Sequence, residues 1–207
     1  VRRGRKVLFC DRDKQGTASI TFRIGVSEGL PVPSSCDLDE LVGRLDGAEA
    51  GYDLVVIDCP PGDEARQREA LELCDIALIP CGQTGPDQWS IYGNGKDPDN
   101  ALRPKTLDVV RRVQREGNQA LLAYVLINNV HPKSADGRKV RQNLAVPGGL
   151  PVLAAELWWS ALYGAAFDAG AGITTYMPRS RAAGQVRDLF DAVWEMRGRV
   201  VRLKETK

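Results

Sequence analysis

The sequence lacks the residues from which metal centres and disulfide frameworks are usually built. It contains one histidine, His131, and five cysteines without a C-x-x-C pair. A zinc site is not expected, because such sites need clustered thiolates and imidazoles. An odd number of scattered cysteines is typical of free thiols in a reducing compartment. The net charge is only +1, so bulk charge gives no case for a nucleic-acid partner.

Long hydrophobic runs are also absent. No apolar stretch reaches the roughly 18 residues that a membrane-spanning helix needs, and no signal peptide is visible. The 207 residues are 43% hydrophobic and 27% charged, which is typical of a soluble globular protein of one domain. The sequence therefore predicts a cytoplasmic protein without a membrane partner.

The chain does contain a series of short apolar runs that each end in Asp, Pro or Gly. They predict an α/β fold whose parallel strands lie at residues 6–10, 54–58, 76–80, 121–128 and 151–154. Amphipathic segments predict helices at residues 37–45, 63–73, 105–116, 157–169 and 182–197. Segments rich in turn residues predict loops at residues 25–35 and 93–104.

Three acidic residues follow the first two of these strands. Asp11 and Asp13 come after the first strand, and Asp58 ends the second. Ligands of open α/β sheets lie outside the carboxyl ends of the strands, so we expect these acids to share one crevice. Mg²⁺ prefers oxygen ligands and keeps most of its waters, so the acids suit a Mg²⁺–phosphate ligand. The alternative is that they only form Asx turns at the strand ends.

Several motifs in series resemble those of the ParA/MinD-type partition ATPases, a deviant branch of the P-loop NTPases. D-R-D-K-Q-G at 11–16 resembles the family's D-x-D-x-Q-G motif, and Y-D-L-V-V-I-D-C-P-P at 52–61 resembles its Walker B strand. Three further matches follow in the family's order: I-P at 79–80, Asn128, and P-R-S-R-A-A at 178–183. The resemblance implies a P-loop NTPase-like fold, a mainly parallel sheet flanked by helices, with ATP and Mg²⁺ as ligands.

The family's phosphate loop, K-G-G-x-G-K-[TS], does not occur in the sequence. Val1 stands where the family's second strand is about to begin, so a βα unit of roughly 30 residues is expected to be missing. Two explanations stay open: an incomplete copy of the gene product, favoured because the acids are kept, or a degenerate relative. Residues 1–207 are expected to form a single, N-terminally truncated ParA-like domain that folds poorly alone, because a central strand is missing.

The resemblance also implies roles for individual residues. Asp58 would be the Walker B acid that orients Mg²⁺ through water, and Asp13 the acid that positions the attacking water. Asp11 would contact the Mg²⁺ shell or order its loop, which Gln15 would help to shape. Pro60, within Pro-Pro-Gly, would stiffen the loop that senses the γ-phosphate, or would simply reverse the chain.

Towards the end of the chain, two residues have matched positions near the base. Asn128 would bind the adenine edge or cap its strand, and Pro178 would close over the base or begin a helix. His131 is expected to be an ordinary loop histidine, and one ring of Trp158 and Trp159 is expected to pack while the other is exposed. Basic residues near the last helix would bind DNA without sequence preference, or be ordinary solvated charges: Arg179, Arg181, Arg187, Arg197 and Arg199.

The implied function is that of a ParA-type ATPase for plasmid or chromosome partition. Such a protein would be a nucleotide-dependent homodimer that binds non-specific DNA, is nucleoid-associated, and hydrolyses ATP when a ParB-like adaptor stimulates it. Two alternatives stay open. One is a cargo-positioning ATPase for another complex, such as conjugation machinery. The other is a degenerate, non-hydrolysing scaffold.

Overall fold

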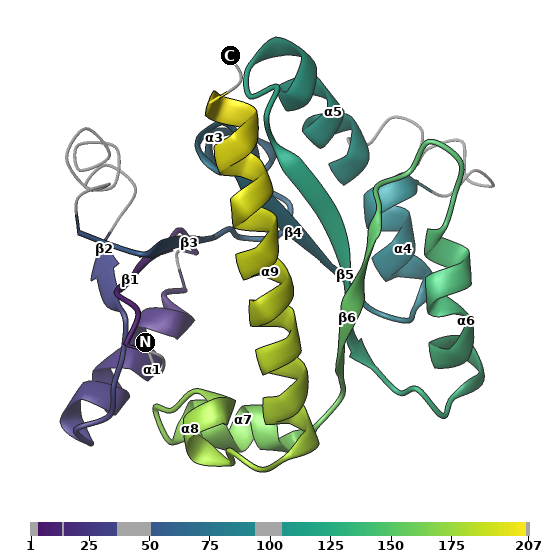
Figure 1. Ribbon diagram of the computed structural model, residues 1–207. Helices are drawn as coiled ribbons and strands as arrows, with labels where there is room; N and C mark the ends of the chain where they lie inside the picture. Colours follow the sequence, from purple (N-terminus) through teal and green to yellow (C-terminus); the bar gives the residue numbers. More distant parts are fainter. Residues whose placement is uncertain (1–3, 14, 37–50, 94–104, 206–207) are drawn as a thin grey trace. The chain divides into compact units, whose positions relative to one another are not determined.

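The computed structural model describes residues 4–13, 15–36, 51–93 and 105–205, and the chain divides into two compact units. The first unit comprises Val1–Ala70 and Ala161–Arg179, and the second comprises Leu71–Ser160 and Ser180–Lys207. Each unit contains its own three-stranded sheet, and all strand pairs are parallel (Figure 1). The parallel α/β architecture expected from the sequence is therefore confirmed.

The sheet of the first unit has the order β2-β1-β3. Its strands are β1 (Val7–Asp11), β2 (Ser34–Cys36) and β3 (Leu54–Asp58). Because side chains alternate along a strand, Leu8 and Cys10 of β1 join Cys36 in one buried cluster. Phe9 lies on the other face and meets Phe22 of α1 (Thr17–Ser27) edge-on, with ring centroids 5.0 Å apart.

Helix α1 packs tightly against the turn that follows α7 (Ala161–Asp168). A Cβ atom added at Gly25 of α1 would lie 2.4 Å from the carbonyl oxygen of Gly170 and 2.7 Å from Cγ1 of Val32. Gly170 has a φ of 64°, in the left-handed region that favours glycine. The two glycines therefore permit a backbone contact that larger residues would prevent. The short helix α8 (Ile173–Tyr176) follows in the same unit.

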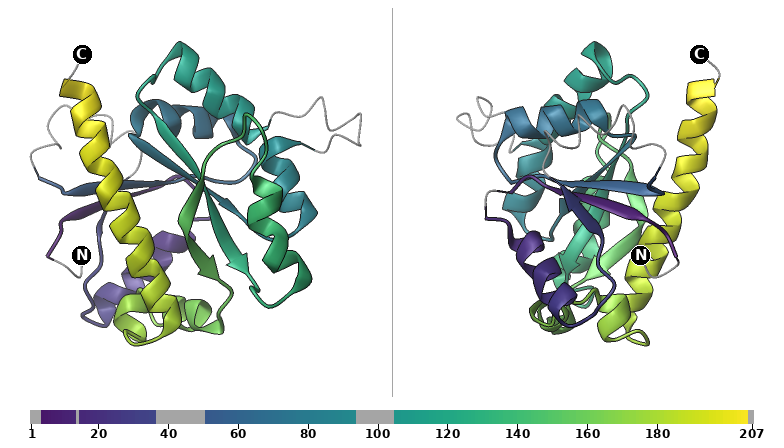
Figure 2. Two further views of the ribbon diagram at one scale, coloured as in Figure 1. Left: turned by 45° about the vertical axis from the view of Figure 1, so that its right-hand side comes forward. Right: turned by 90° about the vertical axis from the view of Figure 1, so that its left-hand side faces the viewer.

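The sheet of the second unit has the order β4-β5-β6. Its strands are β4 (Ile76–Cys81), β5 (Leu122–Val130) and β6 (Val152–Trp158). Its helices are α4 (Gly85–Tyr92), α5 (Thr106–Glu116), α6 (Ala135–Leu144) and α9 (Arg181–Glu205). Val125 and Ile127 of β5 belong to a core shared with α4, α5 and α6, whereas Tyr124 and Leu126 pack with α9. Helix α9 thus covers the face of this sheet opposite to these three helices (Figure 2).

The structure corrects several expected boundaries. Residues 157–169 do not form one helix, because Leu157 and Trp158 complete β6 and α7 begins at Ala161. The physical reason is that β6 continues to pair with β5, as Trp158 is the register partner of Val130. The loop expected at 25–35 is wrong at both ends, since α1 runs to Ser27 and β2 pairs with β1.

Strand β3 differs from its expectation in a second way. A short apolar run of this kind is typical of a strand that is buried on both faces, yet none of the five residues of β3 is buried and Val56 is 36% exposed. Within its sheet β3 pairs with β1 alone, so it is an edge strand of the first unit. The helix expected at 37–45 and residues 94–104 lie outside the described part of the chain. That residues 1–207 form a single truncated domain, and that it folds poorly alone, both stay predictions.

The cysteine and membrane expectations can also be compared with the structure. All five cysteines are free thiols, as the sequence predicts; Cys10, Cys36 and Cys81 are buried, whereas Cys59 and Cys74 are half-buried. In the described ranges, no helix has both the length and the apolar character needed to cross a bilayer.

Candidate functional site

The structure brings Asp11 and Asp58 to the same edge of the first sheet. The two residues are register partners at the carboxyl ends of β1 and β3. The backbone N–H of Arg12 donates to the carbonyl of Asp58 at 3.0 Å, which extends the pairing by one residue. The position expected for a ligand of an open α/β sheet is thus occupied by acids.

Asp11 orders the loop that it begins. Its Oδ1 accepts a hydrogen bond from the N–H of Asp13 at 3.1 Å, and its Oδ2 accepts from the N–H and Oγ of Ser19 at 3.2 and 2.9 Å. The residue before α1 is Gly16, which has no side chain to cap the helix. Asp11 therefore supplies the negative charge that the amino end of α1 favours.

Asp13 and Asp58 complete a cluster of negative charge. Asp13 accepts a hydrogen bond from the N–H of Gln15 at 3.0 Å, which forms an Asx turn. Partial desolvation raises the pKa of Asp58 above its usual value, and the charges of Asp11 and Asp13 raise it further. The N–H of Cys59 opposes this effect. The raised pKa of Asp58 is what a carboxylate near uncompensated negative charge shows.

These carboxylates lack cationic partners in the part of the chain that the structure describes. Of the ion pairs found there, none involves Asp11, Asp13 or Asp58. Nor does any group of three His, Cys, Asp or Glu residues in this part converge as a ready metal cage. Mg²⁺ does not require such a cage, because it keeps several waters and uses one or two carboxylates. The donor set therefore fits a hydrated Mg²⁺ ion.

Sequence reasoning overlooked Arg12, which lies between two of the acids. Its side chain is only 9% exposed and is directed to α3 (Glu64–Leu73). Its Nη1 donates to the carbonyl of Arg66 at 2.7 Å, and its Nη2 to Glu69 at 2.6 Å. The D-x-D pattern drew attention to the acids alone. The only available signal was an arginine directly after an apolar strand.

The loop between β3 and α3 is held at both ends. The carbonyl of Pro60 accepts a hydrogen bond from Nε2 of Gln67 at 3.4 Å, and Gly62 has a φ of 76°. Asp63 caps α3 by accepting from the N–H of Arg66 at 3.1 Å. Burial raises the pKa of the Cys59 thiol, although the charge of Arg12 acts against this rise. The loop reverses the chain between β3 and α3, and the idea that it senses a γ-phosphate stays a prediction.

Asn128 lies in the second unit, so its grouping with the acids stays a prediction. It precedes a β-bulge, because Asn129 has a φ of 55° and the register of β5 with β6 shifts there. Within the described ranges, the side chain of Asn128 makes no hydrogen bond. The base-binding and capping interpretations of this half-buried residue both stay predictions.

Pro178 lies in the first unit, within a turn that ends before α9 begins. It is therefore not a first-turn helical proline, and the idea that it closes over a base stays a prediction. The cap of α9 is Ser180, whose Oγ accepts from the N–H of Ala183 at 3.1 Å.

The basic residues proposed for DNA contact lie in different settings. The guanidinium of Arg181 stacks over the Trp158 ring at 4.7 Å, and that of Arg197 over Trp194 at 4.8 Å. Arg187 lies in α9 and makes contacts of its own. Arg179 belongs to the first unit, and the side chain of Arg199 lies outside the described part. No common basic surface follows from these placements.

The aromatic pair behaves as the sequence predicts. Trp158 packs against the main core of the second unit, and its indole N–H donates to Glu156 at 3.0 Å. Trp159 is 55% exposed and stacks on His131, with ring centroids 5.0 Å apart. His131 is an exposed loop residue in this arrangement.

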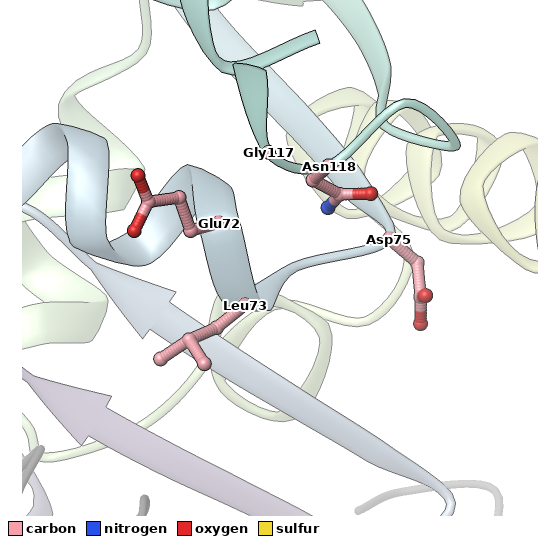
Figure 3. A pocket seen from close by; sticks show the side chains of 5 residues that line it. All are labelled: Glu72, Leu73, Asp75, Gly117 and Asn118. Atoms are coloured by element: carbon pink, nitrogen blue, oxygen red, sulfur yellow. The ribbon is translucent and has the colours of Figure 1, made fainter. Parts of the chain in front are cut away.

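A shallow pocket of about 340 Å³ lies next to the amino ends of β4 and β5, at the end of the second sheet away from Asn128 (Figure 3). It is lined by Glu72, Leu73, Asp75, Gly117 and Asn118. The amide of Asn118 already donates to the carbonyls of Leu71 and Cys74 at 3.1 and 2.7 Å. The amide of Asn118 therefore serves to hold the end of α3 and the turn after it.

Comparison with known proteins gives the following likenesses. No protein-family model matches the chain. It is 28% identical over 198 residues to the protein named Maintenance of carboxysome distribution protein A from Halothiobacillus neapolitanus, covering 93% of this chain and 84% of that protein. The fold resembles the septum site-determining protein MinD complexed with Mg-ADP from Pyrococcus horikoshii, with a TM-score of 0.59, 17% identity and coverage of 96% and 87%. It also resembles the MinD cell division protein from Aquifex aeolicus, with a TM-score of 0.54, 15% identity and coverage of 92% and 86%. The expected P-loop NTPase-like α/β fold is thus confirmed.

Proposed function

We propose that this chain, which belongs to the ParA/MinD family, positions a cargo inside the cell by binding and hydrolysing ATP. The observation that carries the proposal is the cluster of Asp11, Asp13 and Asp58 at the carboxyl ends of β1 and β3. Burial and the nearby charges of Asp11 and Asp13 raise the pKa of Asp58, so the charged form of Asp58 would be stabilised by a cation bound beside it.

The cation in this proposal is Mg²⁺. Asp58 would hold the ion through water, and Asp11, which accepts hydrogen bonds from Ser19 at the amino end of α1, would contact its hydration shell. Asp13 lies one residue beyond Arg12 and accepts a hydrogen bond from the N–H of Gln15, and in this proposal its carboxylate would position the attacking water. Mg²⁺ supplies charge neutralisation at the phosphates when it is bound, and the protein contributes mainly positioning.

The nucleotide needs a second set of groups. Phosphates are held by backbone N–H groups and a lysine of a glycine-rich loop, and the printed sequence contains no K-G-G-x-G-K-[TS] segment. The proposal therefore makes hydrolysis conditional on phosphate-binding groups other than those in the printed residues. Asn128, whose side chain makes no hydrogen bond to the other described residues, would then bind the base edge, and Gln15 and Pro60 would shape the loops around the phosphates.

The proposed cargo is a plasmid or a chromosomal locus, carried by a homodimer that binds DNA through the arginines around α9 and responds to a ParB-like adaptor. A second candidate is supported by a specific finding. The relative from Halothiobacillus neapolitanus is named for the distribution of carboxysomes, so a protein assembly is an alternative cargo. The two candidate cargoes can be told apart by the adaptor protein, which would bind a DNA site in the first case and a protein assembly in the second.

The test is Mg²⁺-dependent ATP hydrolysis by the protein expressed from its complete reading frame. Asp58→Asn should lower the rate by roughly 100-fold or more, because the charge that orients the ion is lost. Asp53→Asn is the matched control. Asp53 precedes β3 at the other end of the strand and accepts from the N–H of Lys6, which an asparagine oxygen can still do. Absence of Mg²⁺-dependent hydrolysis in the wild-type protein would contradict the proposal and favour the non-hydrolysing scaffold.

A further inference from the structure

Arg12 connects the loop that bears the acids to both ends of the next loop. Its N–H donates to the carbonyl of Asp58, where β3 ends, and its guanidinium donates to Arg66 and Glu69 in α3. Arg12 is therefore bonded to the residue that precedes the segment at 59–63 and to the helix that follows it.

The connection is reciprocal. Nη1 of Arg66 donates to the carbonyl of Arg12 at 3.0 Å, while Arg12 donates to the carbonyl of Arg66 at 2.7 Å. Arg66 is itself oriented by Asp63, through an ion pair at 3.3 Å. Movement of the first turn of α3 away from the loop at residues 11–13 would break several hydrogen bonds at once.

The charge on Arg12 does not neutralise the acid cluster. The side chain points to α3, and the ion-pair partner of Arg12 is Glu69, whose side chain is 55% exposed. An exposed partner adds little stability, so stability alone does not account for a nearly buried arginine here. The planar guanidinium instead offers donors to two acceptors at fixed directions, which a lysine ammonium cannot do.

We propose that Arg12 is a positioning residue that couples the loop of Asp11 and Asp13 to the loop after Asp58, so that the carboxylates keep one mutual geometry. The proposal rests on the proposed function of the acids as a cation and nucleotide site. Because Arg12 joins this loop to α3, a displacement of α3 would change the distance between Asp13 and Asp58. Arg12 itself touches neither the cation nor the nucleotide.

The test compares Arg12→Lys and Glu69→Ala with the wild type by two readouts that do not require hydrolysis. Hydrogen exchange measured by mass spectrometry reports opening of residues 11–19 and 58–67, and Mn²⁺ titration followed by electron paramagnetic resonance reports the cation affinity. Arg12→Lys should accelerate exchange in both segments and lower the Mn²⁺ affinity by about tenfold, as loss of an outer positioning contact does. Glu69→Ala should change both in the same direction by about twofold, because its ion pair is exposed.

Arg5→Met is the matched control, since Arg5 forms an exposed ion pair with Asp53 at 3.5 Å in the same unit. It should leave both readouts unchanged. The proposal is overturned if Arg12→Lys folds and leaves the exchange of residues 58–67 at the wild-type rate. If Arg12→Lys does not fold, an unchanged exchange in Glu69→Ala overturns it instead. Loss of Mn²⁺ binding in Asp58→Asn concerns the acid cluster alone, so failure of the proposed function is distinguishable from failure of the coupling.

Discussion

The two register-paired acids should respond to neutralisation with opposite signs of stability change. Asp11 accepts three hydrogen bonds, two from Ser19 and one from Asp13. In Asp11→Asn one amide oxygen remains, so the side chain keeps either the Ser19 bonds or the Asp13 bond. A hydrogen bond to a charged acceptor contributes about 1.5–3 kcal/mol, and a charge at a helix amino end about 0.3–1 kcal/mol. Since one acceptor survives, the net destabilisation should be about 1–2 kcal/mol.

In the described ranges, the carboxylate of Asp58 accepts a hydrogen bond from the backbone N–H of its neighbour Cys59 and from no other group. Desolvation and the nearby acids raise its pKa in the folded protein. Between the unfolded and folded pKa values the folded protein binds more protons, so stability falls as pH rises through that window. Asp58→Asn removes this loss. The variant should be at least as stable as the wild type at neutral pH, and the difference should vanish at pH values below the unfolded pKa.

The assay is urea denaturation followed by far-UV ellipticity, repeated at neutral and acid pH without divalent cations. Added Mg²⁺ should stabilise the wild type and not Asp58→Asn. Two results would refute the reasoning. One is a destabilisation by Asp58→Asn that equals that of Asp11→Asn. The other is an Asp11→Asn variant of wild-type stability, which would show that the bonds to Ser19 carry no weight.

Three further changes have defined outcomes. Gly25→Ala should destabilise the protein by about 1–3 kcal/mol, because its Cβ would meet the carbonyl of Gly170, whereas Gly164→Ala in an open helical position should gain about 0.5–1 kcal/mol; equal midpoints in urea would be inconsistent with the tight contact. Asn128→Ala should leave thermal unfolding unchanged and weaken nucleotide binding by about tenfold, measured with a fluorescent ATP analogue; an unfolding temperature several degrees lower would favour a capping role. Arg197→Ala should reduce the slope of log DNA affinity against log salt by about one, measured by fluorescence anisotropy; an unchanged slope would remove Arg197 from the DNA surface.

Much of the sheet is predictable because its strands carry a local pattern. The alternation of Val125 and Ile127 with Tyr124 and Leu126 divides β5 between two cores, and short apolar runs of this kind need no long-range information. Helix α1 and strand β2 escaped prediction for the opposite reason. The start of α1 is capped by Asp11 from β1, and β2 has only three residues that are held by pairing with β1.

The acids of the site are predictable, but their environment is not. The carboxyl ends of parallel strands place Asp11 and Asp58 together from topology alone. The direction of the Arg12 side chain depends instead on the carbonyl of Arg66 and on Glu69, which lie more than fifty residues away in the chain. Similarly, the bulge at Asn129 that precedes the loop of His131 follows from pairing with β6 and leaves no clear mark in the sequence.

The measurement that tests the central claim most directly is an anomalous difference map from crystals of the complete protein grown with Mn²⁺ and ATP. The account predicts a manganese peak at the carboxyl ends of β1 and β3, beside Asp58 and the hydration sphere of Asp11, with the loss of that peak in Asp58→Asn. A peak only near Glu72 and Asp75, or no peak at any carboxylate of β1 and β3, would contradict the assignment of these acids as the cation site.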